Sequence, residues 1–140
     1  MKLLVAAPTS LVVERDDVVS VRAEDESGDF GVLPGHADFL TVLTISILKW
    51  REGNGALGYC AVRRGVFTVS GGDEVMVATR EAIVSDDLDH LENVVLAHFN
   101  EVAREEESAR LESERLQMLA IRRIMQYLRP ERAPRFDYPT

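Results

Sequence analysis

The spacing of hydrophobic and polar positions changes once along the chain, near residue 85. Before that point, short runs of β-branched and apolar residues are separated by turn residues, a pattern typical of strands. All nine glycines lie in this first part. The residues that follow contain no glycine and are rich in Glu, Arg, Leu and Ala, which favours helix. The pattern therefore predicts an all-β part at 1–84, a helical part at 86–130 and an irregular tail at 131–140.

Strand-like runs in the first part are short and closely spaced. They occupy residues 2–6, 10–14, 18–23, 39–50, 56–63, 66–70 and 74–79. Asn54-Gly55 is a strong hairpin signal, and Gly71-Gly72 joins the last two runs as a second turn. Eight or more strands at this spacing indicate a β-sandwich or a barrel.

The second part carries apolar residues at helical spacing in two stripes. The first stripe is Leu88, Leu91, Val95, Phe99 and Val102, and the second is Leu111, Met118, Ile121, Met125 and Leu128. Both lapse over residues 104–108, which read REEES. We therefore predict two antiparallel helices with a turn near 104–109, ending at Pro130; a single long helix is the rival interpretation.

Charge excludes some functions and is unevenly distributed. With 24 acidic and 16 basic residues, the chain carries a net charge of −8 and has a pI of about 4.9, unlike a general nucleic-acid binder. Residues 86–107 hold eight acidic residues and one arginine, whereas 108–140 hold seven arginines and four acidic residues. This segregation indicates either two solvated faces or a basic arm directed at an acidic partner. No run predicts a secretory signal or a membrane-spanning helix, so we expect a soluble protein in a reducing compartment.

Candidate catalytic and metal-binding groups are sparse. His36, two residues before Asp38, has the character of a general base or of a turn brace. His90 and His98 lack a third ligand for zinc. Cys60 lies within a strand pattern, where cysteine behaves as a small hydrophobe. We therefore expect no catalytic residues, no bound metal and no cofactor.

The most specific sequence motif is a glycine-rich loop. Residues 28–37 read GDFGVLPGHA and lead into LTVL at 40–43. This run resembles the signature of the epsilon subunits of F-type ATP synthases. Three further segments resemble the strand start, the hairpin and the beginning of the helical hairpin that follow in that family: RGVFTV at 64–69, GGDEVMV at 71–77 and LD at 88–89.

The resemblance implies an architecture and a role. Members of the family have a sandwich of about ten strands followed by a C-terminal helical hairpin. They catalyse no reaction, lie in the central stalk, bind the gamma subunit, contact the ring of c subunits and act on the alpha/beta catalytic head. In many members the helical arm inhibits ATP hydrolysis. The chain is then expected at the cytoplasmic face of the bacterial inner membrane, attached only through the complex, with no nucleic-acid partner.

The resemblance also suggests roles for individual residues. Asp29 and His36 match the acid and the histidine of the motif, and are candidates for contact with the c ring. The alternative is that both only shape the turn. Four arginines of the second helix are candidates for contact with an acidic segment of the catalytic beta subunit, because arginine pairs well with carboxylates. They are Arg115, Arg122, Arg123 and Arg129.

One departure from the family concerns nucleotide binding. Some bacterial members bind ATP through a motif of the form Ile/Leu-Asp-x-x-Arg-Ala. Leu88 and Asp89 match it, but Glu92 and Asn93 replace the arginine and the alanine. A carboxylate at the first of these positions repels phosphate, so we expect weak or absent ATP binding and a divergent branch of the family. Two alternatives are a nucleotide-sensing regulatory subunit and an unrelated β-sandwich binding module with a dimerising hairpin.

Overall fold

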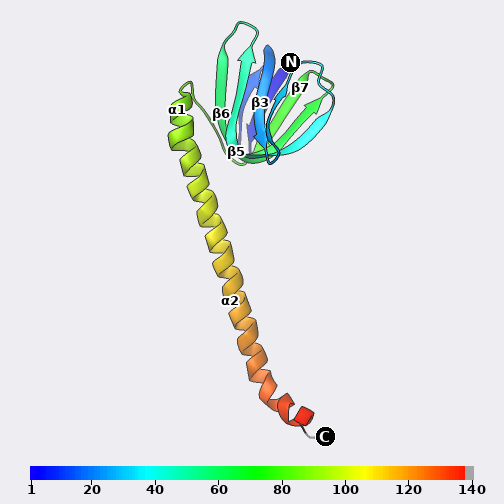
Figure 1. The fold of residues 1–140 in the computed structure, drawn as a ribbon, viewed down its shortest axis with the longest axis vertical. Helices are drawn as coiled ribbons and strands as arrows, with labels where there is room; N and C mark the ends of the chain where they lie inside the picture. Colours follow the sequence, from blue (N-terminus) through cyan, green and yellow to red (C-terminus); the bar gives the residue numbers. More distant parts are fainter. Residues whose placement is uncertain (138–140) are drawn as a thin grey trace. The chain divides into compact units, whose positions relative to one another are not determined.

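The first part of the chain is a β-sandwich of eight strands. The computed structural model describes the backbone of residues 1–137 and the side chains of residues 1–128. The strands are β1 (Lys2–Ala7), β2 (Ser10–Arg15), β3 (Val18–Asp25), β4 (Gly28–Val32), β5 (Phe39–Glu52), β6 (Leu57–Ser70), β7 (Glu74–Thr79) and β8 (Ala82–Val84). They pair in the order β2-β1-β7-β6-β5-β3-β4, and β8 pairs with β6 (Figure 1).

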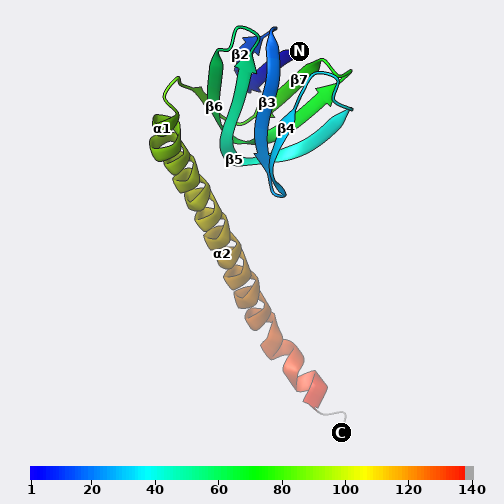
Figure 2. The same cartoon turned by 45° about the horizontal axis from the view of Figure 1, so that its top comes forward.

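Two long strands connect the layers of the sandwich. β5 and β6 pair along their whole length, from Phe39 opposite Val69 to Arg51 opposite Leu57. β7 pairs with the C-terminal half of β6, and β8 pairs with its N-terminal half. Figure 2 shows the curvature of these strands as the sheet folds over on itself. The resemblance implied about ten strands; the structure has eight because β5 and β6 each run unbroken through the fold.

The inner faces of the strands make one core. In β7, Val75 and Val77 are fully buried whereas Met76 is 42% exposed. Phe67 of β6 is also fully buried among these valines. Because successive side chains of a strand point to opposite faces, this alternation commits one face of the sheet to the core and leaves the other outside.

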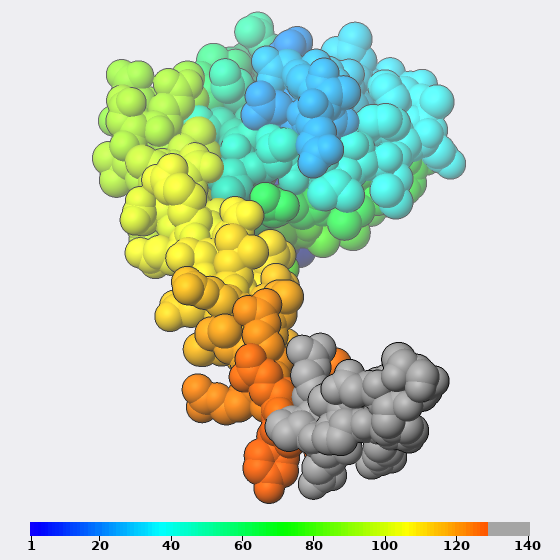
Figure 3. Space-filling model, turned by 60° about the horizontal axis from the view of Figure 1, so that its bottom comes forward, coloured from blue at the N-terminus to red at the C-terminus, as the bar shows by residue number. Residues whose placement is uncertain are grey.

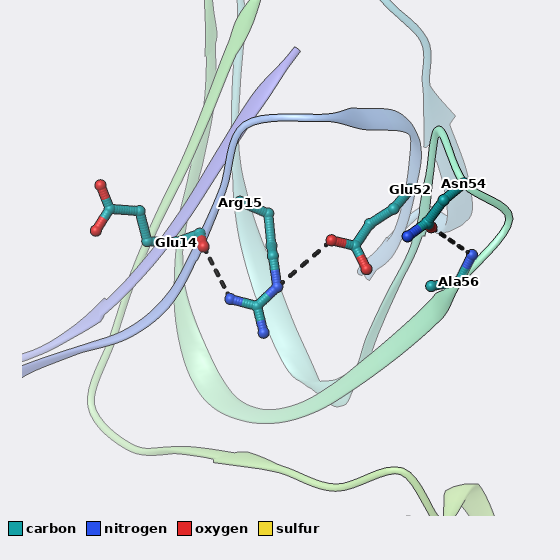
Figure 4. Close-up of polar contacts among 5 residues, drawn as sticks. All are labelled: Glu14, Arg15, Glu52, Asn54 and Ala56. Carbon is teal, nitrogen blue, oxygen red and sulfur yellow. Dashed lines mark hydrogen bonds and ion pairs between the residues drawn. The ribbon is translucent and has the colours of Figure 1, made fainter.

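The Asn54-Gly55 hairpin forms as predicted. The Ala56 amide donates to the Asn54 side-chain oxygen at 2.9 Å (Figure 4). The Glu52 amide donates to the Ala56 carbonyl at 2.8 Å. Arg15 connects this turn to β2: its guanidinium donates to the Glu14 carbonyl at 2.8 Å and lies 3.6 Å from the Glu52 carboxylate. The turn is therefore stabilised by hydrogen bonds within it and by the ion pair between Arg15 of β2 and Glu52.

The start of the helical part packs on the sandwich. It comprises α1 (Leu88–His90), a π-helical turn η1 (Leu91–Val95) and the beginning of α2 (Leu96–Asp137). Asp87 caps it by accepting from the His90 amide at 3.2 Å. Leu91, Val95 and Phe99 are buried together with Ala61 of β6, which confirms three of the five residues of the first predicted stripe; Leu88 and Val102 are only half-buried. In the space-filling view this segment lies directly against the strands (Figure 3).

The π turn keeps these three apolar side chains aligned. On an α-helix, residues four apart drift by about 40° around the axis at each step. A π turn has more residues per turn and winds less per residue. The drift from Leu91 to Val95 through η1 therefore opposes the drift from Val95 to Phe99, and all three side chains reach the same strand surface.

The chain divides into two compact units, Met1–Asn100 and Glu101–Thr140. The predicted helical hairpin is wrong for this structure, because residues 101–137 form a single helix. Residues 104–108 contain no glycine or proline, and Arg and Glu are good helix formers. Ion pairs between residues three and four apart also stabilise this stretch: Glu101–Arg104 at 3.0 Å and Arg110–Glu114 at 4.0 Å.

The predicted end of the helix is also corrected. α2 continues past Pro130 to Asp137, where an irregular tail was expected. Proline removes one backbone donor and crowds the preceding turn, which kinks a helix as readily as it ends one. Residues 138–140 of the predicted tail lie outside the described part of the chain.

Candidate interaction surfaces

The glycine-rich loop between β4 and β5 is tied to the β6–β7 hairpin. The Gly35 amide donates to the Gly72 carbonyl at 2.7 Å, and the Gly71 amide donates to the Asp38 carboxylate at 2.9 Å. Gly35 and Gly72 have φ angles of +88° and +75°, which favour glycine. A Cβ on Gly72 would lie 3.2 Å from the Gly35 Cα, so the two turns need glycine to approach this closely. The loop is therefore a preformed surface.

His36 lies half-buried inside this loop. Its Nδ1 is 2.7 Å from the Ala37 carbonyl, and its ring packs edge-on against Phe39 with centroids 5.8 Å apart. Phe39 in turn contacts Phe30 at 5.5 Å, and Phe30 contacts Phe67 at 5.1 Å. The Asp38 carboxylate accepts from the Gly71 amide, and among the described residues no hydrogen bond joins it to the imidazole of His36. The contacts of His36 stiffen the loop on an aromatic base.

Asp29 occupies a different place from His36. It is exposed on the edge strand β4, opposite Glu24 of β3. It lines a shallow depression of about 220 Å³ together with Lys49 and Glu92, and His36 does not line this depression. Of the two residues singled out by the motif, one is thus an accessible charge and the other is a half-buried brace.

An apolar face, interrupted by Thr68 between Leu40 and Met76, lies on the outer side of β5, β6 and β7. Leu40, Val42, Val66 and Met76 are 66%, 59%, 40% and 42% exposed. Val42 lies opposite Val66 across β5 and β6, and Val66 lies opposite Ala78 across β6 and β7. We call these five residues the open sheet face. Clustered apolar exposure of this kind marks an interaction site.

The open sheet face was missed in the sequence. Its signal is present, because residues 39–43 and 74–78 carry apolar side chains on both alternating sets of positions. Such runs are typical of strands covered on both faces. Here the core covers the inner face, and no described residue covers the outer one.

The helix of the second unit exposes both arginines and apolar residues. Arg115, Arg122 and Arg123 are exposed, and the side chain of Arg129 lies outside the described residues. Apolar side chains between 47% and 63% exposed surround them: Leu111, Leu116, Met118, Leu119, Ile121, Ile124, Met125 and Leu128. Arg122 lines two shallow depressions, one with Met118 and the other with Leu119. Among the described residues, no helix is long and apolar enough to cross a membrane.

The altered nucleotide motif lies where the helical part begins. Leu88 is half-buried, whereas Asp89, Glu92 and Asn93 are exposed. Glu92 shares its depression with Asp29 and Glu24, so this surface concentrates carboxylates beside a single cation, Lys49. The arrangement disfavours a bound phosphate, since each carboxylate repels it.

Two titratable groups of the sandwich are shifted from their ordinary values. Hydrogen bonds from Ser27 and Thr41 hold the pKa of the Asp25 carboxyl below its model-peptide value of 3.8. Burial raises the pKa of the Cys60 thiol from 9.0 to about 12. In the described residues, no group of three His, Cys, Asp or Glu side chains is placed to hold a metal ion. Cys60 therefore has the environment of a packing residue rather than of a thiolate nucleophile.

Relatives of this chain are found over nearly its whole length. A family model described as "ATP synthase, Delta/Epsilon chain, beta-sandwich domain" matches residues 1–85. ATP synthase epsilon chain 2 of Paraburkholderia xenovorans is 42% identical over 132 residues, which cover 94% of this chain and 95% of that protein. ATP synthase epsilon chain 2 of Cereibacter sphaeroides is 41% identical over 137 residues, which cover 98% of this chain and 92% of that protein.

Solved structures share the fold at lower identity. A chain of the Euglena gracilis mitochondrial ATP synthase, in a structure of OSCP, F1 and the c ring, aligns with a TM-score of 0.57 and 22% identity; the match covers 79% of this chain and 64% of that one. A chain of the Tetrahymena thermophila mitochondrial ATP synthase central stalk and c ring aligns with a TM-score of 0.52 and 15% identity, covering 81% and 93%. At these identities the likeness is one of fold.

Proposed function

We propose a rotor function for this chain from the premise that it belongs to the ATP synthase delta/epsilon family, as an epsilon-type subunit. In this proposal it catalyses no reaction itself and lies in the central stalk. It binds the gamma subunit, contacts the c ring and approaches the alpha/beta head, and so couples ion flow to ATP turnover. It is held at the cytoplasmic face of the bacterial inner membrane through these partners. The observation that carries the proposal is the open sheet face.

The open sheet face is our candidate for the gamma contact. Its apolar side chains project from paired strands whose positions are fixed by hydrogen bonding, so little conformational entropy is lost on docking. Buried apolar anchors at the centre of an interface commonly carry most of the binding energy. Val66 lies at the middle of this face, between Val42 of β5 and Ala78 of β7.

Binding to purified gamma subunit tests this assignment. Val42→Asp places a charge in the proposed interface, and we expect at least a hundredfold rise in Kd by isothermal titration calorimetry, or about 3 kcal/mol. Leu57→Asp is the matched control, because Leu57 is 53% exposed on the same strand pair but lies outside the open sheet face. Deleting residues 101–140 should leave gamma binding intact. Equal losses for both aspartate variants would refute the assignment.

The glycine loop is our candidate for the c-ring contact. Support comes from its rigidity, since torque transmission requires a surface that does not deform, and from the exposed charge of Asp29. In the assembled synthase, Asp29→Lys should reduce ATP-driven ion pumping more than ATP hydrolysis. His36→Ala should act through the loop and also lower the thermal stability of the isolated chain. Unchanged pumping in the Asp29 variant would count against this contact.

For the helical arm we propose two conformations. The continuous helix presents Arg115, Arg122 and Arg123, with Arg129 further along, to carboxylates of the catalytic beta subunit and thereby inhibits hydrolysis. The helical hairpin with a turn near 104–109 would be a second, folded state that covers the exposed apolar side chains. Spin labels at residues 100 and 128 distinguish the states, because a continuous helix separates them by about 40 Å. A single distance near this value under all conditions would exclude the folded state.

A further inference from the structure

Arg64 lies at the bend of β6, and its backbone has a left-handed conformation that is unfavourable for residues other than glycine. Its φ angle is +62°, and it is the one residue other than glycine with a positive φ among those that the structure describes. Left-handed backbone brings a Cβ too close to the following carbonyl, so glycine is the usual occupant. A strained residue persists where its surroundings determine the backbone.

The surroundings of Arg64 do determine its backbone. The Thr79 hydroxyl, itself nearly buried, donates to the Arg64 carbonyl. The amide of the preceding residue, Arg63, donates to the Glu81 carbonyl at 3.0 Å. Glycine follows at position 65, with its own φ of +150°. None of these contacts uses the Arg64 side chain, so the bend itself gives no reason for an arginine.

The guanidinium of Arg64 is also unused within its own unit. The side chain is exposed, and the described part of the chain shows no hydrogen bond or ion pair to it. Asp25 lines the same depression of about 690 Å³, but its carboxylate oxygens already accept from Ser27 and Thr41. A cation that keeps its hydration and has no internal partner is available to an external one.

Arg64 lies next to the open sheet face, where a partner subunit would be within reach of its side chain. Arg64 lines its depression together with Val42, the member of the open sheet face that lies on β5 opposite Val66. It also precedes Val66 by two residues along β6, so the cation lies at the border of the apolar surface. A charge at the border of an interface sets partner choice and association rate, because it favours the opposite charge and repels the same one.

We propose that Arg64 is a specificity-determining residue, whose guanidinium pairs with a carboxylate of the subunit that covers the open sheet face. This inference rests on the proposed function, in which that subunit is gamma. The planar fork of arginine matches a carboxylate with two parallel hydrogen bonds, which a lysine ammonium does not reproduce. The pairing would explain why an arginine occupies a position that suits glycine.

The test separates folding from binding in the full-length chain. Arg64→Gly relieves the left-handed strain, so the melting temperature of the isolated chain should rise by about 2–5 °C. The same variant should bind gamma about tenfold more weakly. Its affinity should also depend less on salt between 50 and 300 mM, because the charge pair is gone. Arg51→Ala is the matched control, since Arg51 is exposed on the same strand pair but lies at its far end.

Three outcomes would overturn the proposal. If Arg64→Gly binds gamma as tightly as the unaltered chain, Arg64 makes no such contact, while the proposed function stands. If the variant has a lower melting temperature, Arg64 serves the fold rather than the partner. If the unaltered chain itself fails to bind gamma, the proposed function and this inference fall together.

Discussion

Phe99 and Leu116 lie on the same helix but in opposite circumstances. Phe99 is fully buried against the sandwich, whereas Leu116 is 61% exposed. The first belongs to the unit Met1–Asn100, which has its own core, and the second to the unit Glu101–Thr140, which buries none of its described side chains. Both residues are helical, so secondary structure alone does not determine whether an apolar side chain is buried against another part of the protein.

The two units differ in what stabilises them and in how much apolar surface they leave for a partner to cover. The sandwich is stable through packing and leaves only part of its outer surface apolar. The arm is helical through intrinsic propensity and short-range ion pairs, which contribute little per residue. A helix that exposes apolar residues around its circumference is completed by another surface, since packing supplies most helical stability in proteins. We therefore expect substitutions to affect stability in the first unit and partner binding in the second.

The largest contrast should come from one matched pair of truncations. Phe99→Ala removes a buried ring and should lower the free energy of unfolding by about 3–5 kcal/mol. Leu116→Ala should change it by less than about 0.5 kcal/mol in the isolated chain. Urea denaturation followed by tryptophan fluorescence measures both, because Trp50 is buried in the sandwich. Similar losses for the two variants would abolish the distinction between the units.

A backbone substitution within the sandwich should have the next largest effect. Gly65→Ala places a Cβ 2.3 Å from the Ala78 carbonyl oxygen, a backbone atom that cannot move aside without breaking the pairing with β7. We expect a loss of about 2–3 kcal/mol, measured by thermal denaturation. Gly31→Ala is the control, since its nearest contact would be an ordinary 3.6 Å to the Arg22 side chain. A neutral Gly65 variant would show that the bend is not rigid.

Alkaline pH should destabilise the sandwich through Cys60. Its pKa is raised from 9.0 to about 12, so the folded state retains the thiol proton while the unfolded state loses it. Stability from this group is complete below pH 9 and is lost progressively between pH 9 and about 12, by about 1 kcal/mol at pH 10. Comparing urea midpoints of the parent and Cys60→Ala at pH 8 and pH 10 isolates the effect. Parallel pH dependences would refute it.

The smallest expected effect concerns ATP at the altered nucleotide motif, which lies at the start of the helical part within the first unit. We expect the melting temperature to rise by less than about 1 °C in millimolar ATP, because Glu92 stands where a phosphate partner is needed. The variant Glu92→Arg with Asn93→Ala restores the residue types of the family motif, and should show the larger rise. A clear stabilisation of the unaltered chain would instead favour a nucleotide-sensing arm.

Local signals predicted the local structure well. The loss of glycine after residue 72 and the change of period near 85 correctly divided strands from helix. The Asn54-Gly55 turn and the stripe of Leu91, Val95 and Phe99 also formed as predicted. These features depend on backbone preferences and on side chains a few residues apart, which a single sequence displays directly.

The turn predicted near 104–109 does not form; a gap in an apolar stripe is weak evidence for a turn. A lapse in an apolar stripe shows only that no core touches the helix there. It does not show that the backbone turns, because breaking a helix requires glycine, proline or a competing contact, and residues 104–108 have neither of those residue types.

What the sequence determined by itself was the family, the order of strands before helix, and the alternation that builds the core. What only the tertiary structure decided was which apolar positions stay uncovered and where the backbone is forced into an unusual conformation. Val42 and Val66 read as core residues until their strand neighbours show an open outer face. Arg64 reads as an ordinary charge until the pairing of β6 with two different strands imposes its left-handed bend. Both properties arise from contacts between residues distant along the chain, and such contacts are not encoded in any local pattern.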